Sequence, residues 1–209
     1  MSGVSLHDRV LRASSALARE TGLEAPETGL LGRLPRLLER VSEWTKRVDL
    51  TAARDPDTLV DLYLADAWVL AAAGSEGSWV DVGAGGGAPG LALAMLRPTL
   101  ELTLVESRAK RVAFLRTSGA DLGLENVRVL RSRSEQLLAR SFDVAVSRAA
   151  LPPVQWLAEG TRLARRSVWV LLAGQAAPTR SGARICRELT YTWPLTRTPR
   201  RAVCYAIDG

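Results

Sequence analysis

Two acidic residues flank a glycine-rich loop in the middle of the chain. Asp81 lies just before the run Gly83-Ala84-Gly85-Gly86-Gly87-Ala88, and Glu106 ends the next apolar stretch. A glycine loop that opens a helix exposes backbone N–H groups and carries little side-chain bulk, so a flat or anionic ligand can approach it closely. We therefore expect a nucleotide-like ligand at this loop. The residues expected to contact it are Asp81, Gly83, Gly85, Gly87, Ala88 and Glu106.

Two classes of ligand fit such a loop. The run from Gly83 to Ala88 satisfies the dinucleotide pattern G-x-G-x-x-A, which is a weak signal on its own. Asp81 favours S-adenosylmethionine, because a carboxylate at that strand end can pair with the methionine ammonium group. Glu106 can accept hydrogen bonds from both hydroxyls of a ribose. Helix capping or a solvated strand end is the alternative explanation of both carboxylates, and the glycine loop between them favours S-adenosylmethionine.

The stretches around this loop alternate between strand-like and helical patterns. We expect strands at 79–82, 100–105, 126–130, 142–146 and 167–172, and helices at 89–96, 108–122, 134–139 and 153–164. Alternation in this order predicts an α/β protein with a doubly wound, mainly parallel sheet. Residues 189–193 and 202–207 could pair as a closing antiparallel hairpin across 194–201.

A helical extension precedes this alternation. The expected helices are 4–20, 30–44 and 56–73. A loop through Gly22, Pro26 and Gly29 separates the first two. We therefore divide the chain into an N-terminal helical extension, 1–73, that packs on the sheet, and a methyltransferase-type domain, 79–209.

The composition of the 209-residue chain limits its class. A net charge of +6 and a pI near 10.1 suit a polyanion such as RNA, and an arginine-rich composition set by a GC-rich genome explains them as well. No apolar run is long enough to span a membrane, and the N-terminus does not resemble a signal peptide, so we expect a cytoplasmic protein. Cys186 and Cys204 lack metal-ligand spacing, so we expect two buried free thiols and no metal site.

The residues after the fourth strand narrow the type of methyl acceptor. Ser147-Arg148-Ala149-Ala150 stands where enzymes that methylate exocyclic amines commonly carry an Asn/Asp-Pro-Pro-aromatic loop. Both cysteines follow the last parallel strand, which disfavours the cysteine nucleophile that C5 methylation of a pyrimidine needs. Neither lysine is well placed to deprotonate a ribose hydroxyl. Guanine N7 is already nucleophilic, so its methylation needs positioning and no general base.

Several segments together resemble the RsmG (GidB) methyltransferases, which make 7-methylguanosine in bacterial 16S ribosomal RNA. The matching segments are DVGAGGGAPG (81–90), KRVAFL (110–115), LENV (124–127), SRSE (132–135) and FDVAVSRA (142–149). The segment WTKRVDLTAARDP (44–56) is similar to the one those enzymes carry before their methyltransferase domain. The resemblance covers about residues 34 to 174 and implies a Rossmann-like, class I S-adenosylmethionine-dependent methyltransferase.

The resemblance also implies roles for particular residues. Those that would lie at the cofactor are Gly83, Ala88, Ser134, Glu135 and Arg148, with Ser134 and Glu135 near the adenine. Arg133 and Arg148 would contact cofactor or RNA. The departures from the family pattern are Asp49 for asparagine, Tyr63 for histidine, Ala88 for leucine and Ala173 for lysine, whereas Asp66 is kept.

Arg148 is the residue that we expect to be catalytic. It follows the fourth strand at the carboxyl edge of the sheet, where its guanidinium could clamp a phosphate or the methionine carboxylate. An ion pair with Asp143 or Glu106 is the alternative. The arginines and the lysine at 108, 110, 111 and 116 are expected to form a solvated helix face. The residues expected to contact RNA are Asp49, Arg133, Arg200 and Arg201.

These observations lead to one main hypothesis and two alternatives. The main hypothesis is transfer of a methyl group from S-adenosylmethionine to N7 of a guanine in 16S ribosomal RNA. The partner would be 16S rRNA or the 30S subunit, with no membrane and no obligate protein partner. The alternatives are an RNA-binding assembly factor that has lost the chemistry, and a methyltransferase for another RNA or a small molecule.

Overall fold

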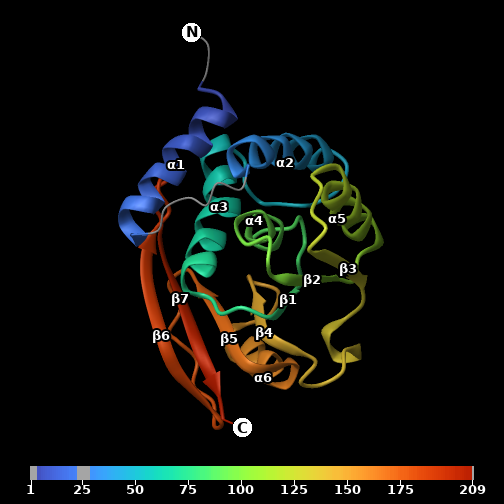
Figure 1. Cartoon of the computed structure of the whole chain (residues 1–209), viewed down its shortest axis with the longest axis vertical. Coiled ribbons are helices and arrows are strands. Elements are labelled where there is room, and N and C mark those ends of the chain that lie inside the picture. The colour runs from blue at the N-terminus through green and yellow to red at the C-terminus, as the bar shows by residue number, and fades with distance from the viewer. Residues whose placement is uncertain (1–3, 23–28, 209) are drawn as a thin grey trace.

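A seven-stranded sheet with the order β3-β2-β1-β4-β5-β7-β6 forms the centre of the molecule (Figure 1). The structure is a computed structural model that describes residues 4–22 and 29–208. The strands are β1 (Ser78–Val82), β2 (Glu101–Glu106), β3 (Val127–Arg131), β4 (Phe142–Ser147), β5 (Ala164–Leu172), β6 (Ala183–Thr192) and β7 (Pro199–Ile207). Neighbours among β1 to β5 are parallel, and β7 is antiparallel to both β5 and β6. The predicted mainly parallel sheet with a closing hairpin is confirmed.

Helices cover the two faces of the sheet unequally. The helices are α1 (Leu6–Thr21), α2 (Leu30–Thr45), α3 (Pro56–Ala73), α4 (Gly90–Leu96), α5 (Ala109–Asp121) and α6 (Pro153–Leu163). One apolar cluster joins α1 to α5 with the sheet residues Trp79, Leu104 and Trp169. A second cluster lies on the other face, where α6 packs on β4 and β5. The N-terminal helices thus share a core with the sheet, and the division of the chain into two parts at 73 and 79 stays a prediction.

The alternation of side chains along β1 sets the position of its one acidic residue. Trp79 belongs to the cluster on the helix-rich face, whereas Val80 and Val82 belong to the cluster beneath α6. Successive side chains of a strand point to opposite faces. Asp81 therefore points to the same face as Trp79, where it meets Gly90 at the start of α4.

Two expected elements differ from those in the structure. The helix expected at 134–139 is only a 3₁₀ turn, Ser134–Gln136. The Ser134 carbonyl oxygen accepts from the Leu137 N–H at 2.9 Å, and the guanidinium of Arg162 donates to the carbonyl oxygens of Ser134 and Leu137 at 2.7 and 2.9 Å, so it caps the end of this short turn. The hairpin strands are longer than expected, because Pro199, Arg200 and Arg201 pair with β6 instead of lying in the turn.

The two cysteines lie side by side on the hairpin as free thiols. Cys204 on β7 is buried, as expected, but the expectation for Cys186 is wrong, because it is exposed on the edge strand β6. A register shift between Ile185 and Arg187 lies at this point, and Cys186 Sγ donates to the Cys204 carbonyl oxygen at 3.3 Å.

Within 4–22 and 29–208, none of the helices is long and apolar enough to cross a membrane.

Candidate active site

The glycine loop after β1 is packed too closely for side chains at three of its positions, Gly83, Gly86 and Gly87. Gly83 has φ of +71°, and a Cβ there would lie 2.3 Å from the Cβ of Ala150. A Cβ on Gly86 would lie 2.7 Å from the hydroxyl oxygen of Tyr63. The backbone N–H groups of Gly83 and Ala84 both donate to the carbonyl oxygen of Val105, at 2.9 and 3.0 Å. The loop is thus fixed between α3, the end of β2 and the segment after β4.

Tyr63 of α3 holds the glycine loop from the side of the N-terminal helices. Its hydroxyl donates to the Gly86 carbonyl oxygen at 2.6 Å, and burial raises the pKa of this phenol. From the sequence, Tyr63 is only a departure from the pattern of the family that the chain resembles. In the structure the phenol reaches the loop directly, so the substitution provides a contact between the helical extension and the loop.

Glu106 is held with its carboxylate toward the loop. Its side chain is 5% exposed. Oε2 accepts from the backbone N–H of Gly85 at 3.1 Å, and Oε1 accepts from that of Arg108 at 2.8 Å. Arg111 Nη1 lies 3.8 Å from Oε2. Because a carboxylate has about four lone-pair positions, Glu106 keeps capacity for hydroxyl donors of a ligand.

A cleft follows the loop and continues past Glu106. The loop cleft, of about 370 Å³, is lined mainly by Gly83–Gly86, Ala88, Glu106–Arg108, Arg111 and Arg148–Ala150. A smaller hollow of about 150 Å³ adjoins it and is lined by Ser132–Glu135, Leu151 and, again, Gly83, Glu106 and Ala150. The expected cofactor residues Gly83, Gly85, Ala88, Glu106, Ser134, Glu135 and Arg148 are thus brought together, and Arg133 joins them at the hollow.

Asp81 and Gly87 do not line this cleft, and a cofactor contact at either residue stays a prediction. Asp81 is 1% exposed, and its Oδ2 accepts from the Gly90 N–H at 3.2 Å, so it holds the start of α4. Burial raises the pKa of this carboxyl to about 7, against a smaller opposing effect of Arg148. A Cβ on Gly87 would lie 2.4 Å from a methyl group of Leu91. Both residues therefore support the glycine loop and the start of α4 without lining the cleft.

Arg148 lines the loop cleft and also a second cavity on its other side. It directly follows β4, and its Nε donates to the carbonyl oxygen of Ala88 at 3.4 Å. The suggested ion pairs are not formed, because Glu106 faces Arg111 and Asp143 pairs with Arg165. Within the described chain, Arg148 makes no ion pair, so its charge is left for a ligand.

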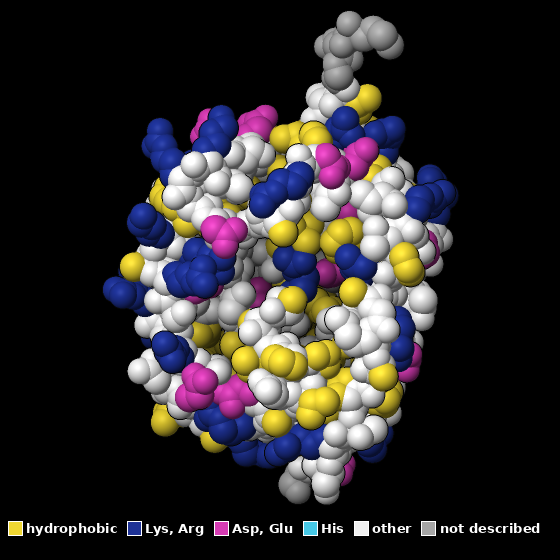
Figure 2. Space-filling view, turned by 180° about the vertical axis from the view of Figure 1, so that it is seen from behind, with side chains coloured by type: hydrophobic (Ala, Val, Ile, Leu, Met, Phe, Trp, Pro, Cys, Tyr) yellow, Lys and Arg dark blue, Asp and Glu magenta, His cyan; other side chains and the backbone are white. Residues whose placement is uncertain are grey.

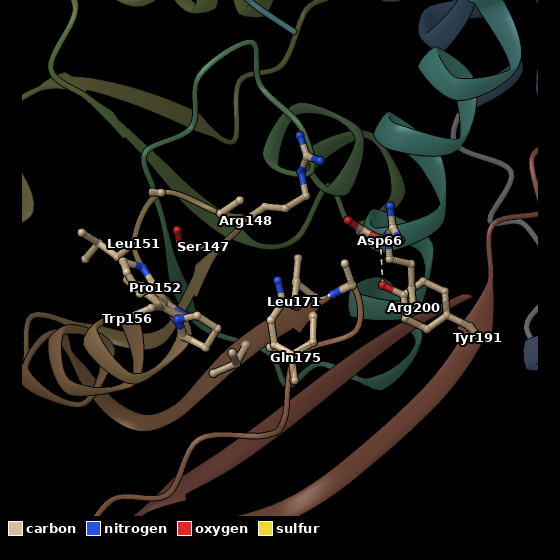
Figure 3. A pocket seen from close by; sticks show the side chains of 16 residues that line it. Asp66, Ser147, Arg148, Leu151, Pro152, Trp156, Leu171, Gln175, Tyr191 and Arg200 are labelled. Carbon is tan, nitrogen blue, oxygen red and sulfur yellow. Dashed lines mark hydrogen bonds between the residues drawn. The ribbon is translucent and has the colours of Figure 1, made fainter. Parts of the chain in front are cut away.

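A second cavity opens on the other side of Arg148 (Figure 3). This β4–β5 cavity has a volume of about 490 Å³ and is lined by Asp66, Ser147–Pro153, Trp156, Val170–Ala173, Gln175, Tyr191 and Arg200. Arg148, Ala149 and Ala150 line both it and the loop cleft. Ala149 has φ of +57°, which is uncommon for a residue with a side chain and typical of strained functional segments.

The four residues expected at RNA do not form one surface. Arg200 stacks on the Trp193 ring at 3.9 Å and lines the β4–β5 cavity. Arg201, the next residue along β7, pairs with Glu188 at 2.7 Å and lines none of these cavities, since neighbouring side chains on a strand alternate. Arg133 is exposed at the hollow. The two hairpin arginines thus face different surroundings, and their contact with RNA stays a prediction.

Asp49 and Arg111 form a pair that the sequence did not suggest. Arg111 donates from Nε to the Asp49 carbonyl oxygen at 2.8 Å and from Nη2 to its Oδ2 at 3.1 Å. Arg111 also lines the loop cleft, so its assignment to a solvated helix face is wrong. Its position in the first turn of α5, directly after the strand that ends at Glu106, is the signal that could have placed it. Together with Arg148 and Arg200, this pair lines an outer groove of about 490 Å³.

The strand order, the glycine loop and the carboxylate at the end of β2 together define an S-adenosylmethionine-dependent methyltransferase. Solved structures share this fold: the chain resembles a SAM-dependent methyltransferase from Aquifex aeolicus with a TM-score of 0.52 and 19% identity, over 73% of this chain and 94% of that one. It also resembles M. jannaschii TYW2 in complex with AdoMet, with a TM-score of 0.50 and 11% identity, over 68% and 73% of the two chains.

The family is shown by sequence. The model of the GidB family, rRNA small subunit methyltransferase G, matches residues 31–180. The Ribosomal RNA small subunit methyltransferase G of Chromohalobacter salexigens is 40% identical over 168 residues, which are 79% of each chain. The protein of the same name from Methylobacillus flagellatus is 33% identical over 168 residues, 79% of this chain and 81% of its own. The chain belongs to the GidB family of ribosomal RNA methyltransferases and uses S-adenosylmethionine as its cofactor.

Proposed function

We propose that the chain methylates N7 of a guanine in 16S ribosomal RNA. The observation that carries this proposal is the junction at Arg148, where a cleft suited to a nucleotide cofactor meets a second cavity that can take an acceptor. The family supports an rRNA substrate.

The residues of the loop cleft fit S-adenosylmethionine. When bound, this cofactor supplies an electrophilic methyl group. Glu106 would accept hydrogen bonds from the ribose hydroxyls, and the hollow lined by Ser134 and Glu135 would hold the adenine. The bare backbone at Gly85 lets the ligand approach closely, and the guanidinium of Arg148 would hold the methionine carboxylate or a phosphate.

The β4–β5 cavity is lined by one carboxylate, Asp66, and by no described histidine or lysine, so it fits an acceptor whose methylation needs no strong base. Its titratable lining residues are Asp66, Arg148, Tyr191 and Arg200. Burial raises the pKa of Tyr191 well above its usual value, and the neighbouring Asp66 carboxylate raises it further, so this phenol does not act as a base. The lone pair of guanine N7 is free, and holding the base in line with the methyl group supplies much of the rate.

Basic side chains around the cavities fit a substrate with a phosphate backbone. Figure 2 shows a face with a hollow near its middle, and Lys and Arg side chains lie beside this hollow among hydrophobic and a few acidic side chains. Arg111, Arg148 and Arg200 line the outer groove, and Arg133 lies at the hollow beside Ser134. We infer that these arginines hold phosphates of 16S rRNA or the 30S subunit, in the cytoplasm, where such subunits are assembled.

Ribosomal RNA from a deletion strain tests the proposal. Nucleosides from its 16S rRNA should lack one 7-methylguanosine, which complementation with the intact gene restores. Full 7-methylguanosine in the deletion strain would overturn the choice of substrate. Calorimetry with S-adenosylmethionine is the second test, because the absence of binding would favour an assembly factor without chemistry over any enzyme.

A further inference from the structure

A buried carboxylate on α3 borders the β4–β5 cavity. Asp66 is 2% exposed and lines the cavity. Its Oδ1 accepts two hydrogen bonds, from the Tyr191 hydroxyl at 2.7 Å and from Trp193 Nε1 at 3.2 Å. Figure 3 shows the hydrogen bond from Tyr191 to Asp66, and the other carboxylate oxygen of Asp66 lies on the side of Arg148. Oδ2 makes no hydrogen bond with any described residue, so it is available to a ligand.

Asp61 provides an internal comparison on the same helix. It is also buried, but its carboxylate accepts from the backbone N–H groups of Leu195 and Thr196 at 2.8 to 3.2 Å and from the Thr196 hydroxyl at 2.9 Å. It lines none of the cavities described above. Asp61 therefore uses both oxygens to hold the turn between β6 and β7, whereas Asp66 uses one oxygen in this way and leaves the other at the cavity.

The walls of the cavity fit the faces of a flat base. Leu151, Pro152 and Leu171 supply apolar surface, and Trp156 is fixed by the bond from its Nε1 to the Trp169 carbonyl oxygen at 2.9 Å. A volume of about 490 Å³ lies in the range of small-molecule sites. RNA enzymes commonly place an unstacked base between apolar or aromatic side chains and contact its Watson–Crick edge with polar groups.

We propose that the β4–β5 cavity takes the target base and that Oδ2 of Asp66 selects guanine by accepting from its N1–H and N2–H groups. This inference rests on the proposed function. A carboxylate only accepts hydrogen bonds. Guanine presents two adjacent donors on its Watson–Crick edge, whereas adenine and cytosine present a ring nitrogen acceptor beside their amino group, and uracil presents one donor between two carbonyl oxygens. Asp66 therefore matches guanine alone among the four bases.

The same contact orients the base. N7 lies on the edge of guanine opposite N1 and N2, so a base held at Asp66 turns N7 away from α3. Arg148, Ala149 and Ala150 form the wall that the cavity shares with the loop cleft. The anchored base thus directs N7 toward the side from which the methyl group comes.

The contact becomes stronger as the reaction proceeds. N7 forms a bond to the methyl carbon while the carbon–sulfur bond breaks and its electron pair stays on the sulfur. The guanine gains a positive charge and loses no proton, and its N1–H and N2–H groups become stronger donors. An interaction that strengthens as charge develops lowers the barrier. Asp66 is thus a specificity residue that also stabilises the transition state.

A substrate pair tests the inference: RNA with guanosine or inosine at the target position, assembled into subunits. Inosine lacks the 2-amino group and keeps N1–H and N7. We expect the wild-type chain to favour guanosine by about tenfold in kcat/KM, the size expected for one hydrogen bond to a charged acceptor. In Asp66→Asn the preference should disappear and kcat/KM for guanosine should fall at least about tenfold. Cofactor affinity by calorimetry should not change.

Asp61→Asn is the matched control, because it changes a buried carboxylate of the same helix and should keep the preference for guanosine. Equal N7 methylation of both RNAs by the wild-type chain would overturn the role of Asp66 and leave the proposed function intact, and this outcome needs no variant that folds. An unchanged preference in Asp66→Asn would also overturn it. No methylation of either RNA would instead refute the proposed function.

Discussion

The hydroxyl of Tyr63 donates to the carbonyl oxygen of Gly86 at 2.6 Å, and this bond joins α3 to the glycine loop that lines the loop cleft. The phenol is fully enclosed, and a side chain at Gly86 would collide with it. Helix α3 therefore supports the loop directly.

Tyr63→Phe should weaken binding of S-adenosylmethionine several-fold and lower the free energy of unfolding by about 1 kcal/mol, because a buried carbonyl oxygen loses its donor. Calorimetry and urea unfolding measure the two effects. Tyr205→Phe is the control, since the Tyr205 hydroxyl donates to the Pro178 carbonyl oxygen at the same 2.6 Å away from the cleft. Equal cofactor affinity in both variants would contradict a role for Tyr63 at the loop.

Glu106→Gln should weaken cofactor binding by about 10- to 100-fold, the cost of losing hydrogen bonds to a charged acceptor. The amide keeps the shape but turns an NH₂ group toward the donors Gly85 N–H or Arg108 N–H. Calorimetry gives the dissociation constant. Glu188→Gln, which changes a surface partner of Arg201, should bind as the wild-type chain does. A Glu106 variant with wild-type affinity would show that the ribose lies elsewhere.

Arg148→Lys should lower kcat/KM on the rRNA substrate by about 100-fold while the chain stays folded, because a lysine ammonium cannot reproduce the planar fork of a guanidinium. Steady-state methyl transfer is the measurement. Arg165→Lys provides the comparison, since Arg165 pairs with Asp143 outside the cavities. If the two variants keep similar activity, Arg148 is not at the junction of cofactor and acceptor.

The stability of the chain should depend on pH through Asp81. Burial raises its folded pKa from the usual 3.8 to about 7, so the folded state favours the protonated form. Asp81 therefore lowers stability progressively as the pH rises from about 4 to 7. Asp81→Asn should gain on the order of 2 kcal/mol relative to the wild-type chain between pH 5 and pH 8, measured by urea unfolding.

Asp143 serves as the control for this pH dependence, because its pKa is shifted in the opposite direction. Hydrogen bonds from the Ser78 backbone and from Arg165 hold its pKa at about 2. Its contribution to stability is complete above the unfolded pKa and is lost only as the pH falls below about 4. Asp143→Asn should thus be destabilised equally at pH 5 and pH 8. A parallel pH response of the two variants would contradict the burial of Asp81.

The order of elements could be predicted because periodicity and glycine positions are local signals. The strand at 79–82 and the glycine loop after it were found within one or two residues. The pattern after Ser134 predicts a helix where the structure has a 3₁₀ turn, whose first carbonyl oxygen accepts from both the Leu137 N–H and Arg162; the contact with Arg162 spans 28 residues, so no local pattern contains it. The exposure of Cys186 likewise depends on the edge position of β6, which sequence alone does not give.

The sequence predicts the position of a site residue where that residue lies at the carboxyl end of a parallel strand. Glu106 ends β2 and Arg148 follows β4, and both line the loop cleft at the carboxyl edge of the sheet. Asp81 also ends near that edge, but the pleat of β1 turns it under α4. Tyr63 and Asp66 reach the loop and the hairpin from a helix that precedes the sheet, so their partners follow from tertiary packing.

The most direct test of the account is mass spectrometry of nucleosides from 16S rRNA after reaction with the purified chain and S-adenosylmethionine carrying a deuterated methyl group. Subunits from the deletion strain serve as the substrate. The label should appear in 7-methylguanosine and in no other nucleoside. Label in another nucleoside, or no transfer by a chain that binds the cofactor, would contradict it.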